Sequence, residues 1–110
     1  GLRNLPVDEA RALGSLVSCR PGQIASKALS STPGVDMTLL SFSSGESVSN
    51  EEYFGDTLYY VVLGAATIVL PDKRIDMHEG DVLKVDAHVL HAVESVGDLK
   101  LLQITLVDDD

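Results

Sequence analysis

Residues 80–95 read GDVLKVDAHVLHAVES, and this stretch decides the fold that we expect. It opens on the turn signal Gly80-Asp81, and the short runs rich in Val and Leu that follow predict strands over residues 81–85 and 91–95. Similar turn signals recur about every eight to twelve residues from Pro21-Gly22 onward, a spacing typical of an all-β sandwich or barrel. The sequence therefore predicts a domain built mainly of short strands.

The runs between these turns are rich in Val, Leu, Ile, Thr and Tyr. In Val35-Asp36-Met37-Thr38-Leu39 apolar and polar residues alternate, as in a strand with one buried face. The expected strands cover residues 23–30, 35–43, 57–63, 65–70, 74–77, 81–85, 91–95 and 99–107. The N-terminal stretch differs, because apolar residues at positions 7, 10 and 13, acids in the first turn and a closing Gly14 predict a short helix over residues 7–13.

The composition fits one small folded domain. The chain has 110 residues, of which 45% are hydrophobic and 23% charged, so it can bury a core of its own. Its single cysteine, Cys19, allows no intrachain disulfide, which indicates a reducing compartment and hence the cytoplasm. No second cysteine stands near Cys19, so we expect a small buried or edge residue there and not a nucleophile.

The net charge and the short apolar stretches argue against two classes of partner. Seventeen acidic residues stand against eight basic ones, and the net charge of −9 repels a phosphate backbone. The apolar stretches are interrupted by Gly, Pro or charge well before the ~20 residues that a membrane span requires. We therefore expect neither nucleic acid nor a membrane as a partner.

Two stretches carry motif-like spacing, one from Gly45 to Gly64 and one from Gly80 to Ser95. In the second, Gly-Asp leads through a short strand and a turn to His91. The pair resembles the two motifs of the cupin superfamily, and the resemblance covers nearly the whole chain.

Within this resemblance the first motif is degenerate. Glu51 and Tyr53 stand at the positions of its two histidines, and Thr57 stands at the position of its glutamate. In the second motif His91 keeps the histidine, whereas Asp86 replaces the usual proline and a serine replaces the frequent asparagine.

The resemblance implies the architecture and the assembly. The fold would be a double-stranded β-helix, the jelly-roll barrel, as one cupin domain over residues 1–110. Residues 1–22 would form the N-terminal helix and lead-in, 23–107 the barrel and 108–110 a frayed tail. Relatives of this kind usually form homodimers by lending an N-terminal strand to the partner sheet, and residues 23–30 are the candidate strand.

The resemblance also implies where a metal would bind. A typical cupin holds its ion with three imidazoles and one carboxylate, good donors at neutral pH. This chain offers Glu51 and His91, while Tyr53 supplies a weakly acidic phenol and Thr57 a neutral hydroxyl. We expect no metal, or a divalent metal held weakly by Glu51 and His91.

Tyr59 has two alternative interpretations. Tyr59 shares the alternation of Thr57, Val61 and Leu63, so it is either core filling or a polar group that faces the pocket.

His88 reaches the pocket only if residues 86–90 form a turn, and otherwise it lies in a solvated loop. His78 precedes a tight turn and is expected at the surface. Asp56 is expected to cap a turn by accepting a hydrogen bond from an amide two residues on.

These residues support several functions. The first is a module that binds a small polar molecule in a pocket lined by Glu51, Tyr53, Thr57, Tyr59 and His91, with little or no metal. The alternative is a metal-dependent cupin enzyme of the dioxygenase, isomerase or lyase type that uses Glu51 and His91. A metal-free acid/base pair and a dimerisation scaffold are the other hypotheses, so the sequence leaves open whether the protein is an enzyme.

Overall fold

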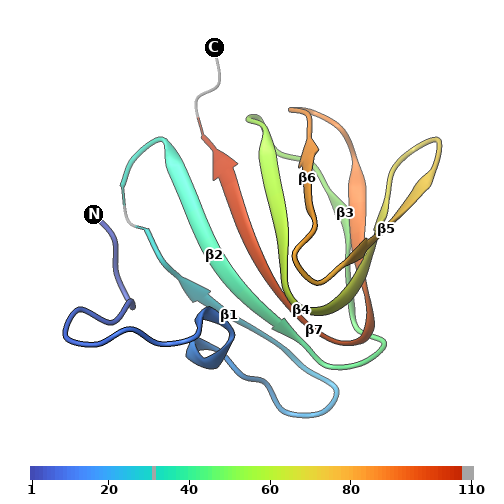
Figure 1. Ribbon diagram of the computed structural model, residues 1–110. Coiled ribbons are helices and arrows are strands. Elements are labelled where there is room, and N and C mark those ends of the chain that lie inside the picture. Colours follow the sequence, from blue (N-terminus) through green and yellow to red (C-terminus); the bar gives the residue numbers. More distant parts are fainter. Residues whose placement is uncertain (31, 108–110) are drawn as a thin grey trace.

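The computed structural model of the protein describes residues 1–30 and 32–107. In this part of the chain one 3₁₀ helix precedes seven strands, shown in Figure 1. The elements are η1 (Leu13–Leu16), β1 (Ile24–Ala28), β2 (Val35–Phe42), β3 (Ser47–Glu51), β4 (Thr57–Val69), β5 (Arg74–His78), β6 (Val82–Val85) and β7 (His91–Leu106). The fold class is the expected all-β barrel.

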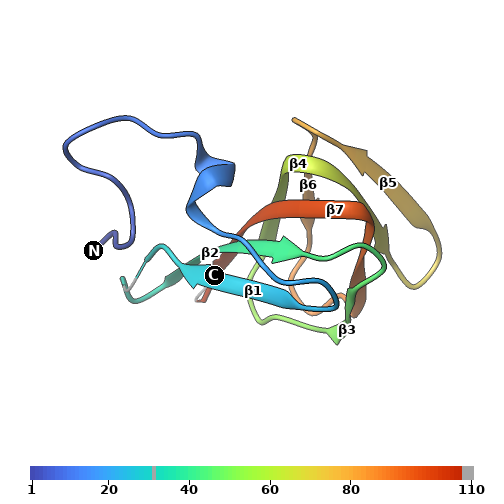
Figure 2. The same ribbon diagram turned by 90° about the horizontal axis from the view of Figure 1, so that it is seen from below.

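The long strands β4 and β7 form the centre of the sheet. They pair with each other antiparallel from Thr57↔Thr105 to Val69↔Ala92. β2 and then β1 extend the sheet beyond one side of β7, β3 pairs with the first part of β7, and β5 and β6 pair with opposite ends of β4. Figure 2 shows these strands curving around a shared interior.

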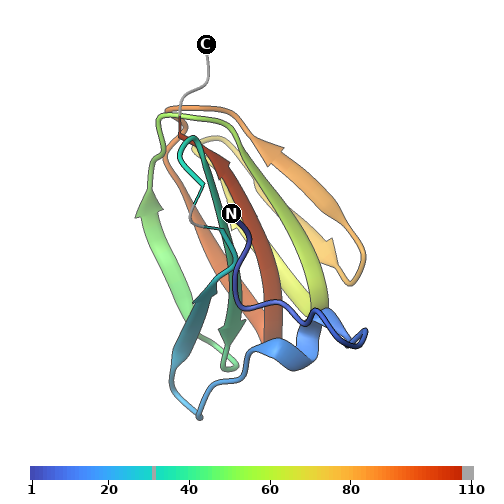
Figure 3. The same cartoon turned by 90° about the vertical axis from the view of Figure 1, so that its left-hand side faces the viewer.

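The main core fills this interior. It includes buried Phe42, Val61, Ile68, Leu99 and Leu101. Removing such side chains from water stabilises the fold by about 1.5–3 kcal/mol each. A second buried cluster, built on Leu16, Val17, Leu29 and Leu39, lies between the N-terminal segment and the outer side of the sheet. Figure 3 shows this segment crossing one side of the molecule.

Two predicted breaks in the strands were wrong. Gly64 and Gly97 both have positive φ, as turn residues do, yet β4 and β7 continue through them. The chain bends there instead, through register shifts between Val61 and Leu63 and between Gly64 and Ala65. A Cβ at position 64 would collide with the carbonyl oxygen of Asp98, so the close approach of the two strands requires glycine.

The same bend changes which side chains of β4 face the barrel interior. Thr57, Tyr59 and Val61 are 1%, 1% and 0% exposed, as their shared alternation predicts. Leu63 belongs to the same alternation but is 49% exposed. The register shift before it reverses which alternate residues of β4 face the interior.

The predicted N-terminal helix over residues 7–13 was also wrong. The helical residues are a single 3₁₀ turn at Leu13–Leu16, which lies beside β4. Val7 is 92% exposed and Ala10 is exposed, so of the expected apolar face only Leu13 packs against the second buried cluster. A short helix with so little packing is marginal in water.

β3 lies in a segment that the sequence did not predict as a strand, because Ser47–Glu51 is mostly polar. The expected tail at 108–110 lies outside the described residues. No helix of the described chain is long and apolar enough to cross a membrane.

Candidate functional site

A hydrogen-bonded pair of buried polar side chains lies at one end of the barrel interior. The Tyr59 hydroxyl on β4 is 2.7 Å from Nε2 of His91 at the start of β7, and the two residues are 1% and 3% exposed. Nδ1 of His91 is 2.8 Å from the carbonyl oxygen of Val89. Because a carbonyl only accepts, Nδ1 carries a proton and donates it there. In the neutral ring Nε2 therefore accepts from the Tyr59 hydroxyl, and both ring nitrogens have partners.

Beside this pair, two threonines face each other across β4 and β7. The Oγ1 atoms of Thr57 and Thr105 are 3.0 Å apart, and both residues are buried. Gln103 stands opposite Tyr59 in the same pair of strands, and its Nε2 donates to Thr105 Oγ1 over 3.3 Å. The hydroxyls and the amide thus satisfy one another within the barrel wall.

Glu51 and Tyr53 lie next to the buried pair and are only half-buried. Glu51 is the cross-strand partner of His91, so both side chains lie on the same face. An irregularity between Val48 and Glu51, with Asn50 at φ 58°, sets this register. The Tyr53 ring centroid is 6.0 Å from that of His91. We call Glu51, Tyr53 and Gln103 the mouth cluster, since their side chains are the half-exposed ones of this polar group.

The two tyrosines at this end of the barrel are held in their protonated forms. Burial is the main cause that raises the pKa of Tyr59 far above its usual value, and the nearby Tyr53 and Glu51 raise it further. Burial also raises the pKa of Tyr53, a hydrogen bond from Gln103 lowers it, and the Glu51 carboxylate raises it again. Both phenols are therefore hydrogen-bond donors at neutral pH.

The structure thus brings all five residues predicted for the pocket to one end of the barrel. Figure 1 shows why, since the end of β3 and the beginning of β4 lie together at the upper end of the molecule. Two residues of the group were missed, Gln103 and Thr105. The alternation through buried Leu99 and Leu101 continues to both of them and would have found them.

Three of the further candidates lie outside this group. His88 is exposed in the loop after β6, with Nδ1 3.7 Å from Glu52 and its ring edge-on to Phe54. His78 is exposed beside Asp81 at 3.7 Å, as expected of a surface residue.

Asp56, which was expected to cap its own turn, accepts a hydrogen bond from the neighbouring loop. Its Oδ1 accepts from the backbone N–H of Ala87 over 2.9 Å, and the N–H of His88 donates to the Tyr53 carbonyl over 2.8 Å. These bonds join the 51–57 loop to the 86–90 loop beside the mouth cluster, because the two loops end adjacent strands.

The donors present do not fit the metal centre that the fold family implies. Among residues 1–30 and 32–107, no group of three or more His, Cys, Asp or Glu side chains could hold a metal ion. The one imidazole in the barrel, His91, has its Nε2 lone pair engaged by Tyr59. A transition-metal site needs about three to four protein donors with free lone pairs, which this end of the barrel does not supply.

The fold and the site together define a class of protein: a jelly-roll barrel whose polar end carries a carboxylate, a phenol and an amide beside a buried Tyr–His pair. No protein-family model matches the chain, and no curated protein matches it.

The solved structures give the family. The chain is 48% identical to a cupin superfamily protein from Desulfitobacterium hafniense DCB-2, over 98% of this chain and 99% of that one, with a TM-score of 0.97. The chain belongs to the cupin superfamily. A conserved protein of unknown function from Streptococcus pyogenes shares its fold at 19% identity, over 99% and 96% of the two chains, with a TM-score of 0.92. Salicylate 1,2-dioxygenase from Pseudaminobacter salicylatoxidans shares the fold at 16% identity, over 74% of this chain and 26% of that one, with a TM-score of 0.69.

Proposed function

We propose that the protein is a cytoplasmic, homodimeric cupin that binds a small polar molecule at the mouth cluster without a metal ion. One observation carries the proposal: half-buried Glu51 and Tyr53 stand beside polar groups that already satisfy one another. No buried side-chain nitrogen or oxygen in the described chain lacks a hydrogen-bond partner. The partly exposed polar groups at this end of the barrel are those of the mouth cluster, so these are the groups that we propose to meet a ligand.

The chemistry of this cluster selects the ligand class. The Glu51 carboxylate accepts hydrogen bonds and attracts cations. The Tyr53 hydroxyl is hydrogen-bonded to Glu51 and Gln103, and it would donate instead to a ligand that takes its place on Glu51. The Gln103 amide both donates and accepts. Such a set matches a neutral polyhydroxylated or a cationic molecule, whereas an anion meets repulsion from Glu51 and from the overall charge of −9.

A thermal-shift panel of polyols, amines and anions tests this function. A ligand present at a hundred times its dissociation constant should stabilise the fold by about 2.7 kcal/mol, which raises the melting temperature of a small domain by more than about 5 °C. Glu51→Gln should remove most of that shift for amines. Glu52→Gln is the matched control, because Glu52 is exposed in the adjacent loop beside His88.

The same panel includes Zn²⁺, Mn²⁺ and Fe²⁺ alone. We expect no specific rise in melting temperature with these ions, since the Nε2 lone pair of His91 is engaged. Stabilisation by anions only would contradict the proposed ligand class, and a saturable metal shift that Glu51→Gln abolishes would favour the metal-dependent enzyme instead.

The homodimer is proposed on the edge strand β1. Within the described chain β1 pairs with no strand but β2. On its other edge Asn4 Nδ2 donates to the carbonyl oxygen of Ala28, so the part of this edge before Ala28 is the one that we propose for a partner strand. We expect multi-angle light scattering at micromolar concentration to give twice the chain mass of 11.7 kDa. A mass of one chain would contradict the assembly without bearing on the mouth cluster.

A further inference from the structure

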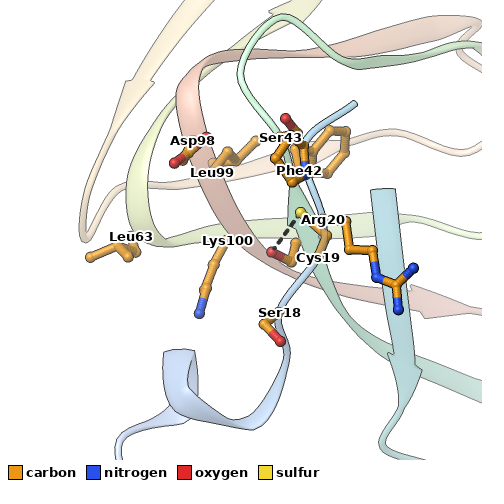
Figure 4. Close-up of a pocket in the computed structure, with 11 residues that line it drawn as sticks. Ser18, Cys19, Arg20, Phe42, Ser43, Leu63, Asp98, Leu99 and Lys100 are labelled. Carbon is orange, nitrogen blue, oxygen red and sulfur yellow. Dashed lines mark hydrogen bonds between the residues drawn. The ribbon is translucent and has the colours of Figure 1, made fainter. Parts of the chain in front are cut away.

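A hollow of about 310 Å³ lies at the end of the barrel opposite the mouth cluster, a volume at the low end of small-molecule pockets. Figure 4 shows that its walls come from the N-terminal segment, the end of β2 and the bent part of β7. Among the residues that line it are Cys19, Arg20, Ser41, Leu63, Leu99 and Lys100.

Lys100 gives this hollow its chemical character. Its Nζ donates to the carbonyl oxygen of Gly14 over 2.5 Å, and its stem lies against the same residue. An ammonium has three donors, so this one acceptor leaves two hydrogens for other groups. In the described chain Lys100 forms no salt bridge with a carboxylate, although the side chain is half-buried. This ammonium is partly covered and is not paired with a carboxylate, so an anion at this position would gain a charge-assisted hydrogen bond.

The other charged side chains of the hollow also favour an anion. Arg20 is a second cation in its wall and likewise forms no salt bridge among the described residues. The one carboxylate of the lining, Asp98, accepts from the backbone N–H of Ser44 over 3.1 Å. Figure 4 shows Asp98 well separated from the ends of the Lys100 and Arg20 side chains. In a chain with a net charge of −9, this hollow has a local excess of positive charge.

One side of Lys100 is apolar. Leu63, turned outward by the register shift in β4, is 49% exposed at the edge of the hollow. A second hollow, of about 460 Å³, adjoins the first, shares Leu63 and Lys100 with it, and is lined further by Leu13 and Val62. An occupant that lies against these side chains would cover apolar surface that is now in water.

From the unpaired Lys100 and the apolar surface beside it we infer a second binding site, for a monocarboxylate with a short apolar body. The carboxylate would accept from Lys100, and the apolar part would lie against Leu63. Arg20 points away from Lys100 (Figure 4), so it adds to the positive charge of the wall without contacting the same carboxylate. The charge preference is opposite to that of the mouth cluster, so the two sites take different ligands.

The chain contains its own reporter for this site. Cys19, the single cysteine, lines the hollow and is partly buried, with Ser41 Oγ donating to its Sγ over 3.4 Å. The reaction rate of this thiol with a chromogenic disulfide therefore reports on one place in the molecule. At about ten times its dissociation constant, hexanoate should leave about one-tenth of the sites open and slow the reaction about tenfold. Hexanamide has the same body without the charge and should leave the rate unchanged.

Three variants separate the site from general effects. Lys100→Met keeps an apolar stem and should abolish the protection by hexanoate. Leu63→Asn changes a side chain that is 49% exposed and should weaken the protection even where Lys100→Met fails to fold. Lys73→Met, which removes a charge from the exposed turn before β5, should keep the full protection. Absence of saturable protection in the wild type, equal protection by hexanamide, or full protection in both Lys100→Met and Leu63→Asn would each overturn the inference.

Discussion

Replacing Tyr59 by phenylalanine is expected to lower the free energy of unfolding by about 1–3 kcal/mol, although it removes a single oxygen atom. The change leaves Nε2 of His91 without a donor in a place where His91 is only 3% exposed. Tyr60→Phe is the matched control, because Tyr60 faces the other side of β4. It should change the free energy by less than about 0.5 kcal/mol. Urea denaturation of both variants measures the difference.

A double-mutant cycle separates the hydrogen bond from packing. His91→Leu leaves the Tyr59 hydroxyl without its acceptor and the Val89 carbonyl without its donor. In Tyr59→Phe/His91→Leu neither end of the Tyr–His bond remains unsatisfied, so the double variant should lose less than the sum of the single losses, by about 1–2 kcal/mol. Strictly additive losses would show that the pair contributes through packing alone.

The Tyr59–His91 pair also shows how much of the site can be predicted from the sequence. The motif position of His91 and the alternation of Thr57, Tyr59 and Val61 predicted residues that the structure buries at one end of the barrel. The engagement of His91 Nε2 by Tyr59 could not be predicted, because it depends on a contact across 32 positions of the chain between strands that bend. Pattern alone gives the face of a side chain but not the partner it meets there.

The bends themselves set the limit of the strand predictions. A positive-φ glycine such as Gly64 has the same local sequence signal in a tight turn and in a bulge within a long strand. What distinguishes the two is the carbonyl of Asp98 on the neighbouring strand, which no local window contains. The facing of Leu63, and with it the hollow beside Lys100, follows from that long-range contact.

The second large effect is expected at high pH, where the fold should lose stability because of Tyr59. Burial raises the pKa of this phenol far above its ordinary value of 10.0, so the folded state keeps a proton that the unfolded chain releases above that pH. The unfolded state then binds fewer protons than the folded one, and the free energy of unfolding falls by about 1.4 kcal/mol per pH unit for this one group. Below the unfolded pKa the contribution to stability is fully present.

Urea denaturation between pH 8 and pH 12 measures this loss. By the top of that range Tyr59 alone should account for about 2–3 kcal/mol, so the curve of Tyr59→Phe should start lower than that of the wild type and then fall less steeply. Tyr53→Phe should flatten the curve in the same direction by a smaller amount, since Tyr53 is half-buried and Gln103 partly offsets the rise in its pKa. Parallel wild-type and Tyr59→Phe curves would mean that the Tyr59 proton is no harder to remove in the barrel than in water. That result would contradict the enclosed position of the phenol, which is 1% exposed and hydrogen-bonded to His91.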